Sequence, residues 1–150
     1  MPLTRFAAVL WMVISAGIAL AEPAVPTPIL PERLAWVSPP RIPALRSAWM
    51  LGTESRAGLY LIRVKLAPGG RIPPHIHPDE RITTVLSGTL HVGFGTAFAE
   101  AGTVAIPTGA AYVAPAGVPH FVWAKEGEVS YQETGMGPTG TVFIDAASPP

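Results

Sequence analysis

Apolar and polar residues alternate along the chain between residues 60 and 144. In the clearest run, 60–66, the even positions are Tyr, Ile, Val and Leu, and the odd positions include Arg63 and Lys65. Successive side chains of a β-strand point to opposite faces, so this run predicts a strand with one buried face. Further short runs, separated mostly by Gly or Pro, are 82–87, 89–94, 104–106, 111–113, 120–124, 129–134 and 141–144. Many short strands between turns predict an all-β sandwich or barrel, placed in one domain at residues 46–150.

A proline-rich segment, residues 22–45, precedes this domain and contains seven prolines. Proline lacks an amide donor and forbids regular helix, so the segment is expected to form an extended N-terminal arm. Residues 34–37 could pair as a strand within it. Two interpretations stay open: the arm lies across a partner subunit, or it is a leader without fixed structure.

Residues 1–21 have the pattern of a secretory signal peptide. Arg5 gives a basic start, residues 6–20 are apolar, and Ala19-Leu20-Ala21 supplies the small residues that precede a cleavage point. The alternative is a membrane anchor, but the apolar run is shorter than the roughly 20 residues that span a bilayer. We therefore expect cleavage before Glu22 and an exported protein, periplasmic or secreted, with no membrane contact after cleavage.

Charge and composition narrow the set of partners. Without Arg5, nine basic residues stand against ten acidic ones, and no basic patch suggests nucleic-acid binding. Charged residues make up 13% of the chain, against about 25% in typical domains. The signal peptide explains part of this deficit, and a surface covered by a second subunit explains the rest, so we expect a homodimer. The chain has no cysteine, and a mature core of this size can fold without disulfides.

Three of the four histidines indicate a metal site. His75 and His77 are two residues apart, so on a strand their rings lie on the same side and can converge on one ion. Asp79 and Glu80 follow at once and offer an oxygen ligand. His120 follows the turn-forming sequence Pro-Ala-Gly-Val-Pro at 115–119. Imidazole with one carboxylate suits a divalent transition metal, namely iron, manganese, nickel, copper or zinc, better than calcium or magnesium.

These residues resemble the two sequence motifs of the cupin superfamily. Gly69, His75, His77, Glu80 and Gly88 are similar to the first motif, with five residues between Gly69 and His75. The second motif is matched as far as its histidine by four residues, Gly109, Pro115, Gly117 and His120. The resemblance covers roughly residues 45–145. It implies a double-sheet jelly-roll barrel in which the three histidines and a glutamate bind one metal ion.

The sequence departs from the motifs at two positions. Seven positions before Gly88 stands Arg81, so Glu80 comes one residue early, and a slip of one residue turns a side chain to the opposite face. Either a bulge at 79–81 returns Glu80 to the metal, as we expect, or the site has three histidines and water. Ala124 also stands where the second motif commonly has Asn. No motif includes His91, which we interpret as a packed or exposed side chain, the alternative being contact with substrate.

Two functions compete. The resemblance implies a metal-dependent enzyme of the dioxygenase or isomerase type that acts on a small molecule, but no general base is evident except a Glu80 freed from the metal. The alternative is a non-catalytic module that binds or senses a small ligand or metal in the cell envelope. No residue pattern decides between them, and no catalytic residue is assigned. A chain exported unfolded acquires its metal outside the cytoplasm, so we expect zinc or copper more often than iron.

Overall fold

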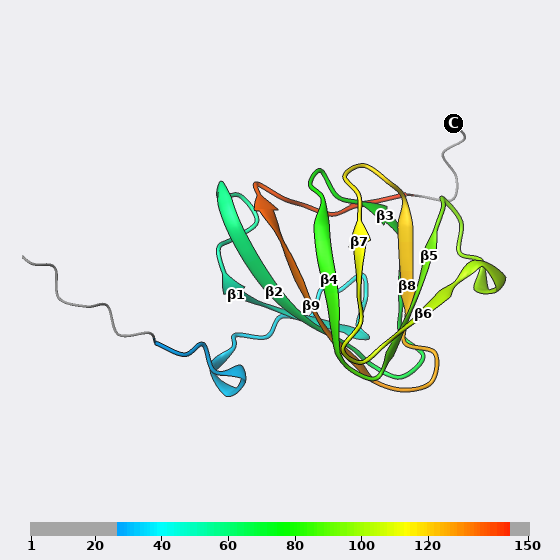
Figure 1. The fold of residues 1–150 in the computed structure, drawn as a ribbon, viewed down its shortest axis with the longest axis horizontal. Coiled ribbons are helices and arrows are strands. Elements are labelled where there is room, and N and C mark those ends of the chain that lie inside the picture. Colours follow the sequence, from blue (N-terminus) through cyan, green and yellow to red (C-terminus); the bar gives the residue numbers. More distant parts are fainter. Residues whose placement is uncertain (1–26, 145–150) are drawn as a thin grey trace, which may run out of the picture.

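The structure is a computed structural model that describes residues 27–144, so the expected signal peptide lies outside the described residues (Figure 1). The described chain contains ten strands and two 3-10 helices: η1 Pro31–Arg33, β1 Leu45–Leu51, β2 Gly58–Leu66, β3 Arg71–Ile76, β4 Arg81–Ser87, β5 Thr89–Phe94, η2 Glu100–Gly102, β6 Val104–Pro107, β7 Ala111–Ala114, β8 His120–Trp123, β9 Val129–Gly137 and β10 Val142–Phe143. The prediction of an all-β protein is confirmed.

The strands form two five-stranded antiparallel sheets. One sheet has the order β1-β2-β9-β4-β7 and the other β10-β3-β8-β5-β6. The chain passes from one sheet to the other at Gly88, between β4 and β5, where the positive φ of 77° suits glycine. The two sheets face each other as the halves of a jelly roll, which confirms the predicted architecture.

The inner faces of the two sheets form the hydrophobic core. Tyr60, Val64 and Leu66 on β2 are at most 4% exposed, as their shared parity predicts. Val64 and Leu66 belong to one buried cluster with Val85 of β4 from the same sheet and Leu90 of β5 from the other. Burial of these apolar side chains holds the sheets together and fixes which strand positions face the interior.

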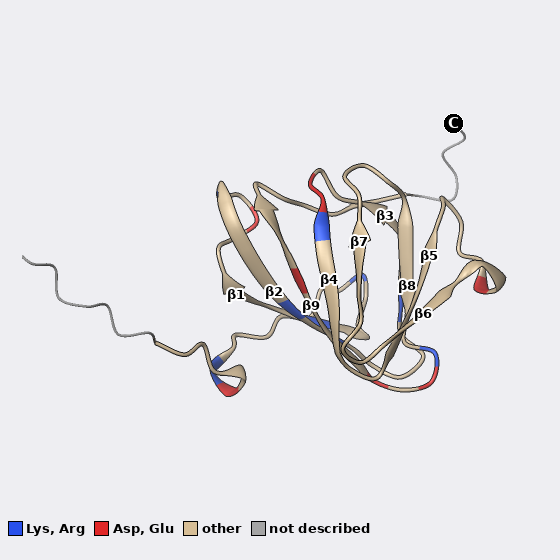
Figure 2. Cartoon of the chain, in the orientation of Figure 1, with Lys and Arg blue, Asp and Glu red and all other residues tan. Residues whose placement is uncertain are grey.

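Part of the proline-rich arm packs against the barrel. Val37 pairs with Ser47 of β1 in an isolated bridge, which lies at the end of the segment 34–37 expected to pair, and Ile42 is buried in the core. No helix in the described residues is long and apolar enough to span a membrane. Charged residues of both signs are scattered along the described strands and loops, with no segment dominated by Lys and Arg (Figure 2).

Candidate metal centre

Two neighbouring strands bring the three histidines together. His75 on β3 lies directly opposite His120, the first residue of β8, and His77 follows one residue after β3 ends. The ring centroids are 4.3 to 5.1 Å apart. One ring nitrogen from each histidine lies within 4.8 Å of the corresponding nitrogens of the other two. All three side chains are buried, so the cluster is enclosed by the barrel.

The backbone fixes the orientation of each imidazole ring. The Nδ1 atoms lie 2.7 Å from the carbonyl oxygen of Pro73 for His75, 2.7 Å from that of Gly140 for His77, and 3.1 Å from that of Val118 for His120. A carbonyl oxygen only accepts, so each Nδ1–H donates, and each Nε2 of a neutral ring keeps its lone pair.

Burial keeps these rings neutral. The pKa of His75 is lowered to about 3 and that of His77 to about 4, chiefly by burial and then by the nearby His120 and Arg81, respectively. Burial also lowers the pKa of His120. Neutral imidazole is the form that binds a metal ion, and the Nε2 of His77 is buried without a hydrogen-bond partner. The three residues therefore fit a divalent transition metal.

Glu80 does not join this cluster. It is exposed in the turn before β4, whereas Arg81, the first residue of β4, is only 3% exposed and faces the interior. Adjacent side chains of an extended segment point to opposite faces, so the inward orientation of Arg81 leaves Glu80 outside. The pairing of β4 with β9 has its register shift between Val85 and Ser87. This position is not the bulge expected at 79–81. Ligation by Glu80 stays a prediction that this geometry does not support.

A buried arginine network occupies the expected place of the glutamate. Arg81 donates from Nη1 to Oε2 of Glu133 at 2.9 Å and from Nη2 to Oδ1 of Asp79 at 3.1 Å. Tyr60 and Thr139 also donate to Asp79. Burial alone would raise the pKa of Asp79, but these hydrogen bonds and the Arg81 charge outweigh burial and hold that pKa below its usual value.

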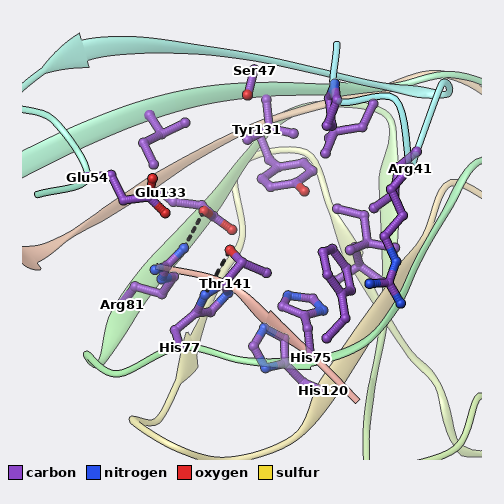
Figure 3. A pocket seen from close by; sticks show the side chains of 18 of the residues that line it. Arg41, Ser47, Glu54, His75, His77, Arg81, His120, Tyr131, Glu133 and Thr141 are labelled. Carbon is purple, nitrogen blue, oxygen red and sulfur yellow. Dashed lines mark hydrogen bonds and ion pairs between the residues drawn. The ribbon is translucent and has the colours of Figure 1, made fainter. Parts of the chain in front are cut away.

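The three histidines line one pocket of about 350 Å³ between the two sheets, together with Arg81 and Glu133 of this network (Figure 3). Apolar walls come from β2 with Ile62 and Val64, and from Phe143 on β10, while Arg41 and Glu54 add charge. A cavity of this size accommodates a small molecule beside the histidines.

Three aromatic side chains and the fourth histidine lie outside the histidine cluster. Tyr112 lines the pocket. Phe121 and Trp123 are buried, where they pack against Phe98. His91 lies on β5 outside the cluster, and its Nε2 is 2.8 Å from a carboxylate oxygen of Glu126. His91 therefore has a carboxylate partner of its own.

The sequence interpretation missed Glu133 as a site residue. On β9 it shares parity with the buried residues Val129 and Tyr131, so it faces the interior. An acidic residue at the third inward position, after Val129 and Tyr131, was the available signal, because buried carboxylates are rare without a partner.

Comparison with known proteins gives one family. A family model described as the cupin domain matches residues 62–131. Germin-like protein 1-1 of Oryza sativa subsp. japonica is 36% identical over 86 residues, which are 57% of this chain and 36% of the relative. The match thus spans about a third of the length of that curated relative.

Two solved structures are also similar. An oxalate oxidase in complex with the substrate analogue glycolate shows 32% identity and a TM-score of 0.50, covering 58% of this chain and 46% of that one. A polyketide cyclase from Streptomyces resistomycificus shows 19% identity and a TM-score of 0.63, covering 81% and 89%. The second likeness concerns the fold alone.

Proposed function

The chain belongs to the cupin superfamily, and from that premise we propose that it is a metal-dependent enzyme acting on a small molecule, of the dioxygenase or isomerase type. One observation carries the proposal. Three neutral histidines, each fixed by a backbone carbonyl, present their remaining nitrogens to a pocket of about 350 Å³. A metal-binding group beside such a space leaves room for a substrate, which a purely structural site does not need.

The chain's own residues divide the work of the site. His75, His77 and His120 would hold the ion, and when bound a divalent metal supplies Lewis acidity or redox chemistry to a small molecule. Ile62 and Val64 would exclude water and contact the apolar part of the substrate. Arg81, held by Asp79 and Glu133, would fix the polar side of the pocket.

One similar structure and the histidine cluster itself support a small, oxygen-bearing substrate. The similar oxalate oxidase is described in complex with glycolate, and the site of this chain has the same kind of histidine cluster that the superfamily resemblance implies. The chain differs from the family motif at Arg81, which stands where the glutamate is expected. We therefore propose a three-histidine site with Arg81 beside it, in place of a site of three histidines and a glutamate.

The proposal is tested by turnover of the metal-loaded protein. Protein loaded in turn with iron, manganese, copper or zinc is screened for dioxygen uptake with small phenolic and diketone compounds, and by mass spectrometry for isomerised products. We expect turnover that is lost in His120→Ala and retained in His91→Ala. If the protein binds ligands but turns none over with any of these metals, the alternative holds and the protein is a non-catalytic binding module.

We also infer that the protein is exported, because residues 1–21 have the pattern of a signal peptide. N-terminal sequencing of protein from the cell envelope should begin at or near Glu22. Exported protein that still begins at Met1 would contradict cleavage.

A further inference from the structure

Glu133 faces the three histidines from the opposite sheet. In the register of its sheet, Glu133 on β9 lies between Ile62 of β2 and Thr83 of β4. It lines the same pocket as His75 and His120. Figure 3 shows its carboxylate across the pocket from the histidine rings. Glu133 is thus the acidic side chain that β9 contributes to the candidate metal centre.

Only one of its two carboxylate oxygens is engaged. Oε2 accepts a hydrogen bond from Nη1 of Arg81 at 2.9 Å, while Oε1 accepts none from the residues that the structure describes. The Glu133 side chain is 13% exposed, and Glu133 lines the pocket. Arg81 is itself fixed by Asp79 and Thr139. The arginine therefore holds the carboxylate in place and leaves one oxygen for a ligand.

The network around Arg81 pairs two carboxylates with one cation. Asp79 alone would neutralise the guanidinium of Arg81, yet Glu133 adds a second carboxylate to the same cation. An extra buried negative charge costs desolvation energy unless a cation or a proton compensates it. A metal ion on the histidines supplies the first kind of compensation, and a proton taken from a ligand supplies the second.

We propose that Glu133 is the proton acceptor of this site. The inference rests on the proposed function and narrows its substrate class to small molecules with an acidic O–H beside a metal-binding oxygen. In the step, the ligand O–H bond breaks and an Oε1–H bond forms, while the electron pair stays on the ligand oxygen, which becomes anionic. Arg81 acts through Glu133 and is a positioning residue.

The test compares two ligands of nearly equal size, of which only one still carries an acidic O–H proton near neutral pH. Benzohydroxamic acid carries an acidic O–H beside a carbonyl oxygen, whereas benzoate is already an anion near neutral pH. Their binding to cobalt(II)-loaded protein is followed by the visible spectrum of cobalt. The variant is Glu133→Gln, and Glu100→Gln is the matched control, because Glu100 is an exposed carboxylate that pairs with Lys125 and does not line the pocket.

We expect Glu133→Gln to bind cobalt as the wild type does and to bind benzohydroxamic acid about tenfold more weakly or worse, because a charged acceptor is lost. Benzoate should bind equally or more tightly, since a like charge is removed. Glu100→Gln should change neither affinity. If Glu133→Gln does not fold, Glu133→Asp keeps the charge and shortens the reach, so it should weaken the binding of benzohydroxamic acid and leave that of benzoate unchanged.

Three results would overturn the inference. Equal weakening of both ligands would mean that Glu133 only supports the shape of the site. An unchanged affinity for benzohydroxamic acid would mean that Glu133 receives no proton. Loss of cobalt in Glu133→Gln would make it a metal ligand instead. Failure of the wild type to bind cobalt would contradict the proposed function itself, which separates the two claims.

Discussion

Gly135 on β9 makes room for the polar network beside the histidines. It lies opposite both Tyr60 and Arg81 in the sheet. A Cβ added there would lie 2.5 Å from the hydroxyl oxygen of Tyr60 and 2.7 Å from Oδ2 of Asp79. These contacts are too short for a real Cβ atom. The hydrogen side chain of glycine therefore leaves room for Tyr60 to donate to Asp79.

The variant Gly135→Ala should therefore be destabilised by about 1 to 3 kcal/mol, the usual cost of overpacking a closed site. Gly102→Ala is the matched control, because nothing lies within 4 Å of the added Cβ. Urea unfolding gives both free energies. Equal stability of the two variants would show that the network tolerates the methyl group.

The buried histidines predict a pH dependence for the metal-free protein. Folding lowers the pKa of His75 to about 3 and of His77 to about 4, in both cases chiefly through burial, against about 6.5 when unfolded. Below pH 6.5 the unfolded chain binds more protons than the folded one, so stability falls as the pH is lowered.

Unfolding of protein treated with a chelator, measured between pH 7.5 and 4.5, should show this decline, and His77→Gln should show a shallower one. A free energy of unfolding that stays constant across this range would contradict the neutral, buried state of the rings.

At the scale of the element, alternation predicts the strands well. The expected runs 60–66, 82–87, 89–94 and 129–134 correspond to β2, β4, β5 and β9. β3 is harder to predict because it contains Pro73 and Pro74, which cannot donate to a sheet ladder. A register shift between Ile72 and His75 accommodates them. The spacing of His75 and His77 nevertheless located two members of the histidine cluster, because it depends on local geometry alone.

The acidic part of the site could not be predicted in the same way. Arg81 and Glu133 are 52 residues apart and meet only because β4 pairs with β9. Strand pairing over such a distance depends on the whole topology, which alternation does not encode. At the offset of one residue, the structure places Arg81 and not Glu80 on the inward face, and ligation by Glu80 stays a prediction.

Metal binding should tie β3 to β8 and stabilise the barrel. His75 and His77 come from β3 and the residue after it, and His120 from β8, so an ion bound only by the folded form raises stability. Calorimetry should show a higher melting temperature with metal than after chelation. His120→Ala should lose this difference and His91→Ala should keep it. A wild-type melting temperature unaffected by chelation would refute the coupling.

At the scale of the whole molecule, one sheet presents apolar side chains on its outer face. Leu51, Ile82 and Val113 are 45 to 51% exposed, and with Leu61 and Thr134 they form one row across the five strands. Exposed apolar patches commonly mark an interface. They add to the reasons from composition to expect a dimer, built partly by residues 31–50.

Sedimentation velocity at micromolar concentration should show the dimer, and Leu51→Glu on β1 should shift it toward the monomer. Glu100→Gln, on the short helix η2 outside these residues, is the control and should not shift it. A wild-type monomer at this concentration would contradict the prediction.

Elemental analysis of protein purified from the cell envelope, without a histidine tag or nickel column, tests the central claim most directly. The histidine geometry predicts one divalent transition metal per chain, zinc or copper more often than iron. The metal should be mostly lost in His75→Ala, His77→Ala and His120→Ala and retained in His91→Ala. Stoichiometric iron or manganese would contradict the prediction of zinc or copper and favour the dioxygenase type. A folded wild type without metal, or metal lost in His91→Ala but not in His75→Ala, would contradict the three-histidine metal centre.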